Sequence, residues 1–262
     1  MSTHYPGEEN TSDDFVPETP PVSQSPVGQV SVDLEANKPT VTHTILAITI
    51  AMFVLQLVSQ SLFRMDYLAD LGAKINKEIL QGQIWRLITP VLLHGSITHI
   101  FFNMYALLSI GRDVERFYGH KRYLALYLAA AFAGNVLSFL VTQASSYGAS
   151  TAIFGLIAAE GIFIFRNRKF FRNSRAMLIN IAVVIGINLF IVGMIPNIDN
   201  FGHLGGLVGG GLFAWLAGPL WGESGCFPQV KISDVSDKSR TLPVFLGVCL
   251  LFALVALLKF FF

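Results

Sequence analysis

Two polar residues at the starts of different hydrophobic segments could together perform nucleophilic chemistry. Ser150 lies in the small-residue run 148–155, and His203 lies in the glycine-rich run 201–210. A serine hydroxyl is a weak nucleophile until a base within about 2.6–3.2 Å takes its proton, and histidine is the usual base. If the two side chains meet, they could attack a carbonyl carbon. The positions of both residues then predict hydrolysis inside a membrane.

A second polar cluster precedes another hydrophobic segment. His99 and Asn103 are four residues apart, so on a helix they share one face. Their side chains could donate hydrogen bonds to the oxyanion that forms when a carbonyl is attacked. The simpler alternative is that these side chains form hydrogen bonds between helices. A metal site is not indicated, because His94 and His99 have no carboxylate at ligand spacing, whereas zinc usually has three or four well-placed donors.

The composition places these residues in an integral membrane protein. Hydrophobic residues make up 53% of the 262 residues, charged residues only 13%, and the mean hydropathy is +0.56. An ordinary soluble domain does not have this composition. A spanning helix needs roughly 20 mostly apolar residues. The segments that we expect to span the membrane are 43–63, 97–117, 121–142, 150–166, 176–195, 202–221 and 242–262.

The remaining segments are polar. Residues 1–42 are acidic, contain several prolines and have few large apolar side chains, so we expect a disordered tail. Residues 223–241 form the expected linker to the last span. The net charge of +1 gives no indication of a nucleic-acid partner. The two cysteines, Cys226 and Cys249, indicate neither a disulfide framework nor a metal site.

Lysine and arginine residues predict the orientation, because short basic loops stay in the cytoplasm. They gather in 112–122, 166–175 and 231–240 and are absent from 144–149 and 196–200. We therefore expect the amino terminus in the cytoplasm and the carboxyl terminus outside. The second, fourth and sixth spans then begin on the external side, where the polar residues would line one wet cavity. The external loop 64–97 is discordant, since it carries four basic residues: Arg64, Lys74, Lys77 and Arg86.

Each feature also has a simpler interpretation. Ser150 alone could be a helix cap or a small packing residue. His203 alone could bond to another helix. The glycines most simply indicate close helix packing, and we adopt that interpretation. Its consequence is that the fourth and sixth spans touch, which would bring Ser150 and His203 together.

Together these residues resemble the rhomboid intramembrane serine proteases over roughly residues 43–222. Short matches occur in the order of the family's motifs and on spans of suitable orientation. The matching residues are Trp85 and Arg86 in the first external loop, His94, His99 and Asn103, Glu115 within 111–116, Gly148 and Ser150, and His203 with Gly206 and Gly210.

The resemblance implies an all-α membrane bundle with a six-helix rhomboid core over 43–222. The expected span 242–262 adds a seventh transmembrane helix after this core. It implies an intramembrane serine endopeptidase without a cofactor that cleaves transmembrane helices of membrane-protein substrates near the external side. The plasma membrane is the expected location. By this resemblance, Ser150 is the nucleophile and His203 is the general base. The Ser150 N–H, His99 and Asn103 would donate hydrogen bonds to the oxyanion, and Phe154 would pack on His203. The residues that would support the first external loop are Trp85, Arg86 and Glu115.

One residue departs from the commonest family pattern. Thr151 follows the serine where most members have glycine. An alternative is therefore a catalytically silent rhomboid-like protein that binds membrane helices. A transporter or channel is a third interpretation, but acidic residues lie only toward the inner ends of the spans, at Asp113, Glu115 and Glu160.

Overall fold

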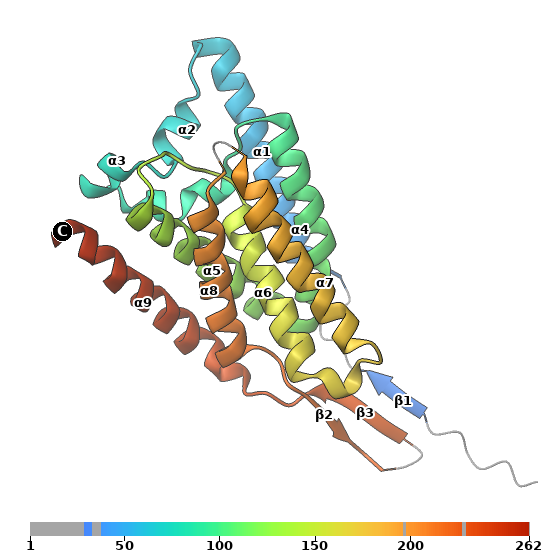
Figure 1. Ribbon diagram of the computed structural model, residues 1–262. Helices are drawn as coiled ribbons and strands as arrows, with labels where there is room; N and C mark the ends of the chain where they lie inside the picture. Colours follow the sequence, from blue (N-terminus) through green and yellow to red (C-terminus); the bar gives the residue numbers. More distant parts are fainter. Residues whose placement is uncertain (1–28, 33–37, 196–197, 227–228, 262) are drawn as a thin grey trace, which may run out of the picture.

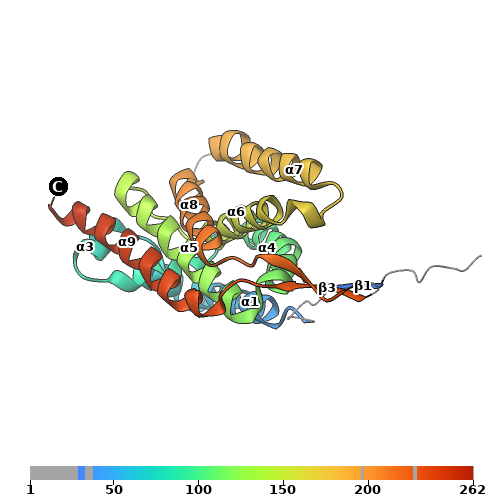
Figure 2. The ribbon, with the colours of Figure 1, turned by 90° about the horizontal axis from the view of Figure 1, so that it is seen from below.

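The computed structural model describes residues 29–32, 38–195, 198–226 and 229–261. Helices dominate these residues, and the long helices gather into one bundle (Figures 1 and 2). The long helices are α1 (Thr40–Phe63), α4 (Ile97–Tyr118), α5 (His120–Val141), α6 (Ser150–Arg166), α7 (Ser174–Gly186), α8 (Asn200–Ala217) and α9 (Thr241–Phe261). A π-helical turn, Ile187–Ile191, and a 3₁₀ turn, Val192–Met194, extend α7.

Four helical stretches among the described residues are long and apolar enough to cross a membrane. They are Thr40–Phe63, His120–Val141, Ser174–Met194 and Lys238–Phe260. The helices α4, α6 and α8 coincide with other expected spans but are not among these four. The helix α6 has only 17 residues, and α8 is rich in glycine. The mostly helical membrane class is confirmed, whereas the count of six core helices plus one spanning helix stays a prediction.

Glycines allow α8 to lie directly against α5 and α6. A Cβ atom on Gly206 would overlap the carbonyl oxygen of Thr151, and one on Gly210 would overlap the backbone of Gly155. On the α5 side, a Cβ atom on Gly205 would lie 2.7 Å from the carbonyl oxygen of Ala133. Backbone therefore meets backbone at these crossings, as small residues permit in membrane helices.

The segment between α1 and α4 is a folded loop. It contains α2 (Tyr67–Gly72), α3 (Asn76–Leu80) and the 3₁₀ turns Ile84–Leu87 and Thr89–Leu92. The buried Arg86 guanidinium donates to the carbonyl oxygens of Ala73 and Asp70 at 2.9 and 2.6 Å. The half-exposed Trp85 indole donates to the carbonyl oxygen of Leu71 at 3.1 Å. Both side chains therefore join the 3₁₀ turn Ile84–Leu87 to residues 70–73 of the same loop.

Glu115 has a different structural role from the one that we expected. Its buried carboxylate lies at the other end of α4, where it accepts hydrogen bonds from the backbone N–H groups of Val41 and Thr42 at 2.8 and 2.7 Å. The Thr42 hydroxyl donates to it as well, at 2.6 Å. A carboxylate at a helix start satisfies free N–H groups and complements the helix dipole. Glu115 therefore caps α1, and the expectation that it supports the first external loop is wrong.

Two polar segments contain more structure than the sequence indicated. Strands β1 (Gln29–Val32), β3 (Gln229–Asp234) and β2 (Trp221–Ser224) form a small sheet in that order, beyond the ends of the helices (Figure 1). Strand β1 runs parallel to β3, and β2 runs antiparallel to it. The described part of the expected disordered tail is thus mainly a strand and the start of α1, and the expected linker contains β3 and the end of β2. The remaining tail residues lie outside the described residues.

Adjacent glycines on α8 provide a test of the backbone contacts. We expect Gly210→Ala to destabilise the protein by about 1–3 kcal/mol, because the new methyl group collides with Gly155. Gly211→Ala is the matched control: its methyl group would meet Ile162 at an ordinary 3.6 Å. It should be neutral or stabilising by up to about 1 kcal/mol through helix propensity. Thermal unfolding in detergent measures both, and equal shifts would contradict the packing.

Candidate active site

Ser150 and His203 meet where α6 and α8 begin. Ser150 is the first residue of α6, and His203 lies in the first turn of α8. The Ser150 Oγ atom lies 2.9 Å from His203 Nε2. The imidazole is 6% exposed, so it is shielded from bulk solvent by the surrounding helices. This distance and shielding are what proton transfer from a serine to a base requires.

Stacking orients the His203 ring. The Phe154 ring lies parallel to it, with 4.2 Å between centroids and 11° between planes. Phe154 is one turn after Ser150 on α6, so the same helix supplies the hydroxyl and the ring. Within the described residues, His203 Nδ1 has no hydrogen-bond partner. Packing, and not a carboxylate bonded to Nδ1, therefore fixes the imidazole here.

Asp199 anchors the first turn of α8, a role that was not predicted from the sequence. Its carboxylate accepts from the backbone N–H of Gly202 at 2.9 Å and from the Ser138 hydroxyl of α5 at 2.5 Å. Aspartate is a favoured residue at the position before a helix. Its place four residues before the candidate base was the signal that could have identified it.

The candidate oxyanion residues border the same point. An added Cβ on Gly148 would lie 2.8 Å from His99 Nε2 and 3.8 Å from Ser150 Oγ, so Gly148 separates the two side chains. Gly148 has a φ of 145°, which favours glycine. The buried Asn103 amide donates to the carbonyl oxygen of His99, one turn back on α4, at 3.0 Å. The Asn103 amide is therefore hydrogen-bonded within its own helix, α4.

His94 supports the loop that leads into Ser150. Its ring lies edge-on to His99 with centroids 5.0 Å apart, and its Nε2 accepts from the Ala149 N–H at 3.5 Å. Its backbone is held by Gln56 of α1 through bonds of 3.0 and 3.2 Å. Burial, followed by the nearby His99, lowers the pKa of His94 to about 3. The neutral ring can therefore keep accepting from Ala149 at neutral pH.

Lys74 supports the segment before Ser150, a second role that was not predicted from the sequence. Its buried ammonium donates to the Ala144 carbonyl at 2.6 Å and to the Thr142 hydroxyl and Asn76 side-chain oxygen, each at 3.1 Å. Burial lowers the pKa of Lys74 to about 8. Lys74 thus ties the folded loop to the 142–146 segment before Ser150. Lys74 is one of the four basic residues that made the loop 64–97 unusual for an external loop. Its partners Thr142 and Ala144 lie about 70 residues away in the sequence.

Thr151 occupies a site made by glycines. Its side chain is 5% exposed and faces Gly134 of α5 and Gly202 of α8. An added Cβ on Gly202 would lie 3.1 Å from Thr151 Cγ2. The β-branched side chain therefore uses space that two neighbouring helices leave free.

Within the described residues, no group of three or more His, Cys, Asp or Glu side chains could hold a metal ion.

The fold and this site together define a helical membrane protein with a paired serine and histidine at one end of its bundle. A family model described as Rhomboid domain matches residues 81–220, a stretch that includes Ser150 and His203. The chain belongs to the rhomboid family.

Three relatives agree with this assignment. The chain is 45% identical to Rhomboid protease GluP of Bacillus subtilis (strain 168) over 76% of its own length and 38% of that protein. It is 37% identical to RHOMBOID-like protein 1 of Arabidopsis thaliana, over 59% of this chain and 41% of the relative. Identity to Rhomboid-like protease 1 of Toxoplasma gondii is 37%, over 55% of this chain and 51% of that protein. The chain thus spans about two fifths to one half of these relatives' lengths.

The neutral His94 ring predicts an acid-sensitive contribution to stability. Its folded pKa is below the usual 6.5, so the unfolded chain binds a proton more readily, and stability is lost as pH falls from 6.5 toward 3. Between pH 7 and pH 5 the wild type should lose about 2 kcal/mol more than His94→Gln. Denaturant unfolding in detergent at the two pH values measures the difference. Parallel losses in the two proteins would contradict a buried neutral histidine.

Proposed function

We propose that this protein is an intramembrane serine endopeptidase with Ser150 as nucleophile and His203 as general base. The observation that carries the proposal is the 2.9 Å separation of Ser150 Oγ and His203 Nε2 at the joined starts of α6 and α8. Membership of the rhomboid family, which includes proteins named as proteases, supports it.

In the proposed reaction, His203 Nε2 takes the hydroxyl proton as Ser150 Oγ attacks a peptide carbonyl. The same imidazole then protonates the leaving amine, and the substrate's amino-terminal part remains as an ester on Ser150. A water molecule, deprotonated by His203, hydrolyses that ester. Phe154 keeps the ring in place through both steps, because its stacked ring restricts rotation of the imidazole.

The developing oxyanion would lie near Gly148. The Ser150 N–H at the start of α6 and the His99 ring are the nearest proposed donors, and the positive end of the α6 dipole adds to their effect. Asn103 would join them by turning its amide from the His99 carbonyl toward the substrate. Gly148 leaves the necessary space, since a side chain there would press on His99.

The membrane arrangement is part of the proposal. Seven spans would place the amino terminus in the cytoplasm, the carboxyl terminus outside and the Ser150–His203 pair near the external side of a plasma membrane. The basic loop after α6 supports this orientation, because it lies at the end of α6 opposite Ser150. We retain the division into a tail over 1–42, a core over 43–222, a linker over 223–241 and a last helix over 242–262.

The proposed substrates are membrane proteins whose transmembrane helices unwind locally in the bilayer. Unwinding is required because the carbonyls of an intact helix are hydrogen-bonded and shielded. A helix-binding protein without catalysis is the second candidate, favoured by Thr151 beside Ser150. The fit of Thr151 between Gly134 and Gly202 supports the enzyme, because its side chain packs against the neighbouring helices.

Labelling of the purified protein by a fluorescent fluorophosphonate tests the nucleophile. We expect labelling of the wild type and none of Ser150→Ala or His203→Ala, because the reaction needs both the hydroxyl and its base. Ser109→Ala, an exposed serine of α4, is the matched control and should label fully. Failure of the folded wild type to label beside a reactive rhomboid protease would favour the helix-binding protein.

Asn103→Ala tests the oxyanion role. We expect about a 100-fold lower kcat with a smaller change in KM, because the lost hydrogen bond forms in the transition state. The measurement is cleavage of a transmembrane substrate in proteoliposomes. Asn188→Ala is the matched control, since Asn188 also donates to a carbonyl one turn back, at 2.8 Å, but lies on the extension of α7. Equal effects of the two variants would assign Asn103 a structural role only.

A further inference from the structure

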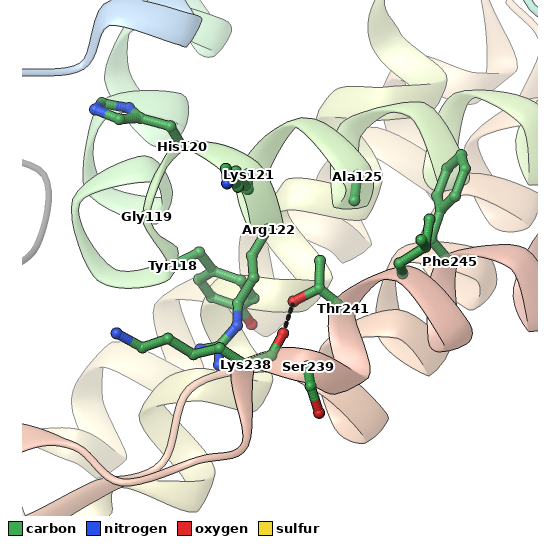
Figure 3. Close-up of a pocket in the computed structure, with 11 residues that line it drawn as sticks. Tyr118, Gly119, His120, Lys121, Arg122, Ala125, Lys238, Ser239, Thr241 and Phe245 are labelled. Carbon is green, nitrogen blue, oxygen red and sulfur yellow. Dashed lines mark hydrogen bonds between the residues drawn. The ribbon is translucent and has the colours of Figure 1, made fainter.

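A cavity lies at the end of the bundle opposite the Ser150–His203 pair. It has a volume of about 750 Å³ and lies between the turn that joins α4 to α5 and the start of α9. Figure 3 shows Arg122 extending from α5 toward the segment that carries Lys238 and Ser239. Its size is that of a typical small-molecule site. The proposed proteolysis does not use it.

The polar lining of this cavity is cationic. Lys121, Arg122 and Lys238 contribute to it, and the eleven lining residues include no Asp or Glu. Three acidic groups near the cavity already have partners: Asp234 binds Arg122 Nη1 at 2.5 Å, Glu115 binds His120 at 2.6 Å, and Asp237 lies 3.7 Å from Arg240. An anion entering the cavity would therefore meet cations and no carboxylate from its lining.

Arg122 gives the strongest indication of a ligand. Its side chain is 4% exposed, and its Nε and Nη2 atoms are buried with no hydrogen-bond partner in the described part of the chain. Buried donors of this kind are rare in folded proteins. Two nitrogens on one edge of a guanidinium match two oxygens of a phosphate. Arg122 is also one of the residues that line the cavity, so a small turn of its side chain would bring this unused edge to an oxyanion bound there.

The opposite lining is apolar and continues along a helix of membrane-spanning length. Ala125 of α5 and Leu242 and Phe245 of α9 line the cavity. Leu242 and Leu246 are 63% and 55% exposed, and the stretch Lys238–Phe260 is long and apolar enough to cross a bilayer. Charged and apolar walls therefore meet where a spanning helix begins, at the depth of lipid headgroups.

We propose that this cavity binds the phosphate of an anionic phospholipid. Arg122, Lys121 and Lys238 would contact the phosphate, and Leu242 and Phe245 would contact the first part of an acyl chain. A free phosphate compound shares the charged interaction but does not use the apolar wall. Residues 238–245 lie outside the stretch 81–220 that matches the rhomboid model, so the lipid would join the rhomboid domain to α9.

Native mass spectrometry of the full chain in detergent tests the proposal. The probes are dioleoylphosphatidylglycerol, dioleoylphosphatidylcholine and glycerol 3-phosphate. We expect phosphatidylglycerol to bind at least about tenfold more tightly than the other two, from the combined charge and acyl contacts. Equal binding of phosphatidylcholine would overturn the anionic site. Equal or tighter binding of glycerol 3-phosphate would assign the cavity to a free phosphate and overturn the lipid.

The exposed lysines allow a variant that should fold. Lys121→Gln with Lys238→Gln should weaken phosphatidylglycerol binding by about 30-fold, since each basic group near a membrane surface contributes about a fivefold gain. Lys169→Gln with Arg175→Gln removes the same charge from exposed positions outside the cavity lining and should change binding less than about threefold. Equal weakening by the two double variants would overturn the site.

Discussion

The close approach of α6 and α8 is the constraint on which the candidate chemistry depends. Proton transfer from Ser150 to His203 requires a contact near 2.9 Å, and the two residues reside on helices joined by no short connection. In a bilayer, lipid is as apolar as a helix surface, so close van der Waals contact must hold helices together. Gly206 against the Thr151 backbone, and Gly210 against Gly155, provide that contact. Larger residues would separate the helices by more than the hydrogen bond allows.

Around this contact, several of the polar groups that the helices bury are held by specific partners. Asp199 is bound by Ser138 and Gly202, and Lys74 is bound by the 142–146 segment. Each satisfied group avoids the large free-energy penalty of an unpaired polar atom in an apolar interior. Other buried polar atoms of the described residues lack a hydrogen-bond partner, and two such groups lie beside the sites proposed here. His203 Nδ1 is unpaired beside the candidate nucleophile, and Arg122 Nε and Nη2 are unpaired beside the cationic cavity.

Hydropathy and local signals predicted the helices well, because each spanning helix must present an apolar length of its own. The expected span 43–63 compares with α1 at Thr40–Phe63, and 121–142 with α5 at His120–Val141. The pairing of Ser150 with His203 could be inferred from glycine spacing and from the resemblance. The partner of Glu115 could not, since it lies 73 residues away at the start of α1. Strand β1 pairs with β3 across about 200 residues, and no local pattern specifies such a contact.

The last helix connects the two ends of the molecule. Val248, Phe252 and Ala256 are spaced by one turn and form the buried face of α9. Phe252 reaches Gly209 on α8, and the Lys259 ammonium donates to the Leu140 carbonyl at the far end of α5, at 2.9 Å. Since α9 packs on both α5 and α8 (Figure 2), a lipid that joins Arg122 to the start of α9 would favour the packing of α9 along the helix that carries His203. The cationic cavity and the candidate active site are thus linked by a continuous set of helix contacts.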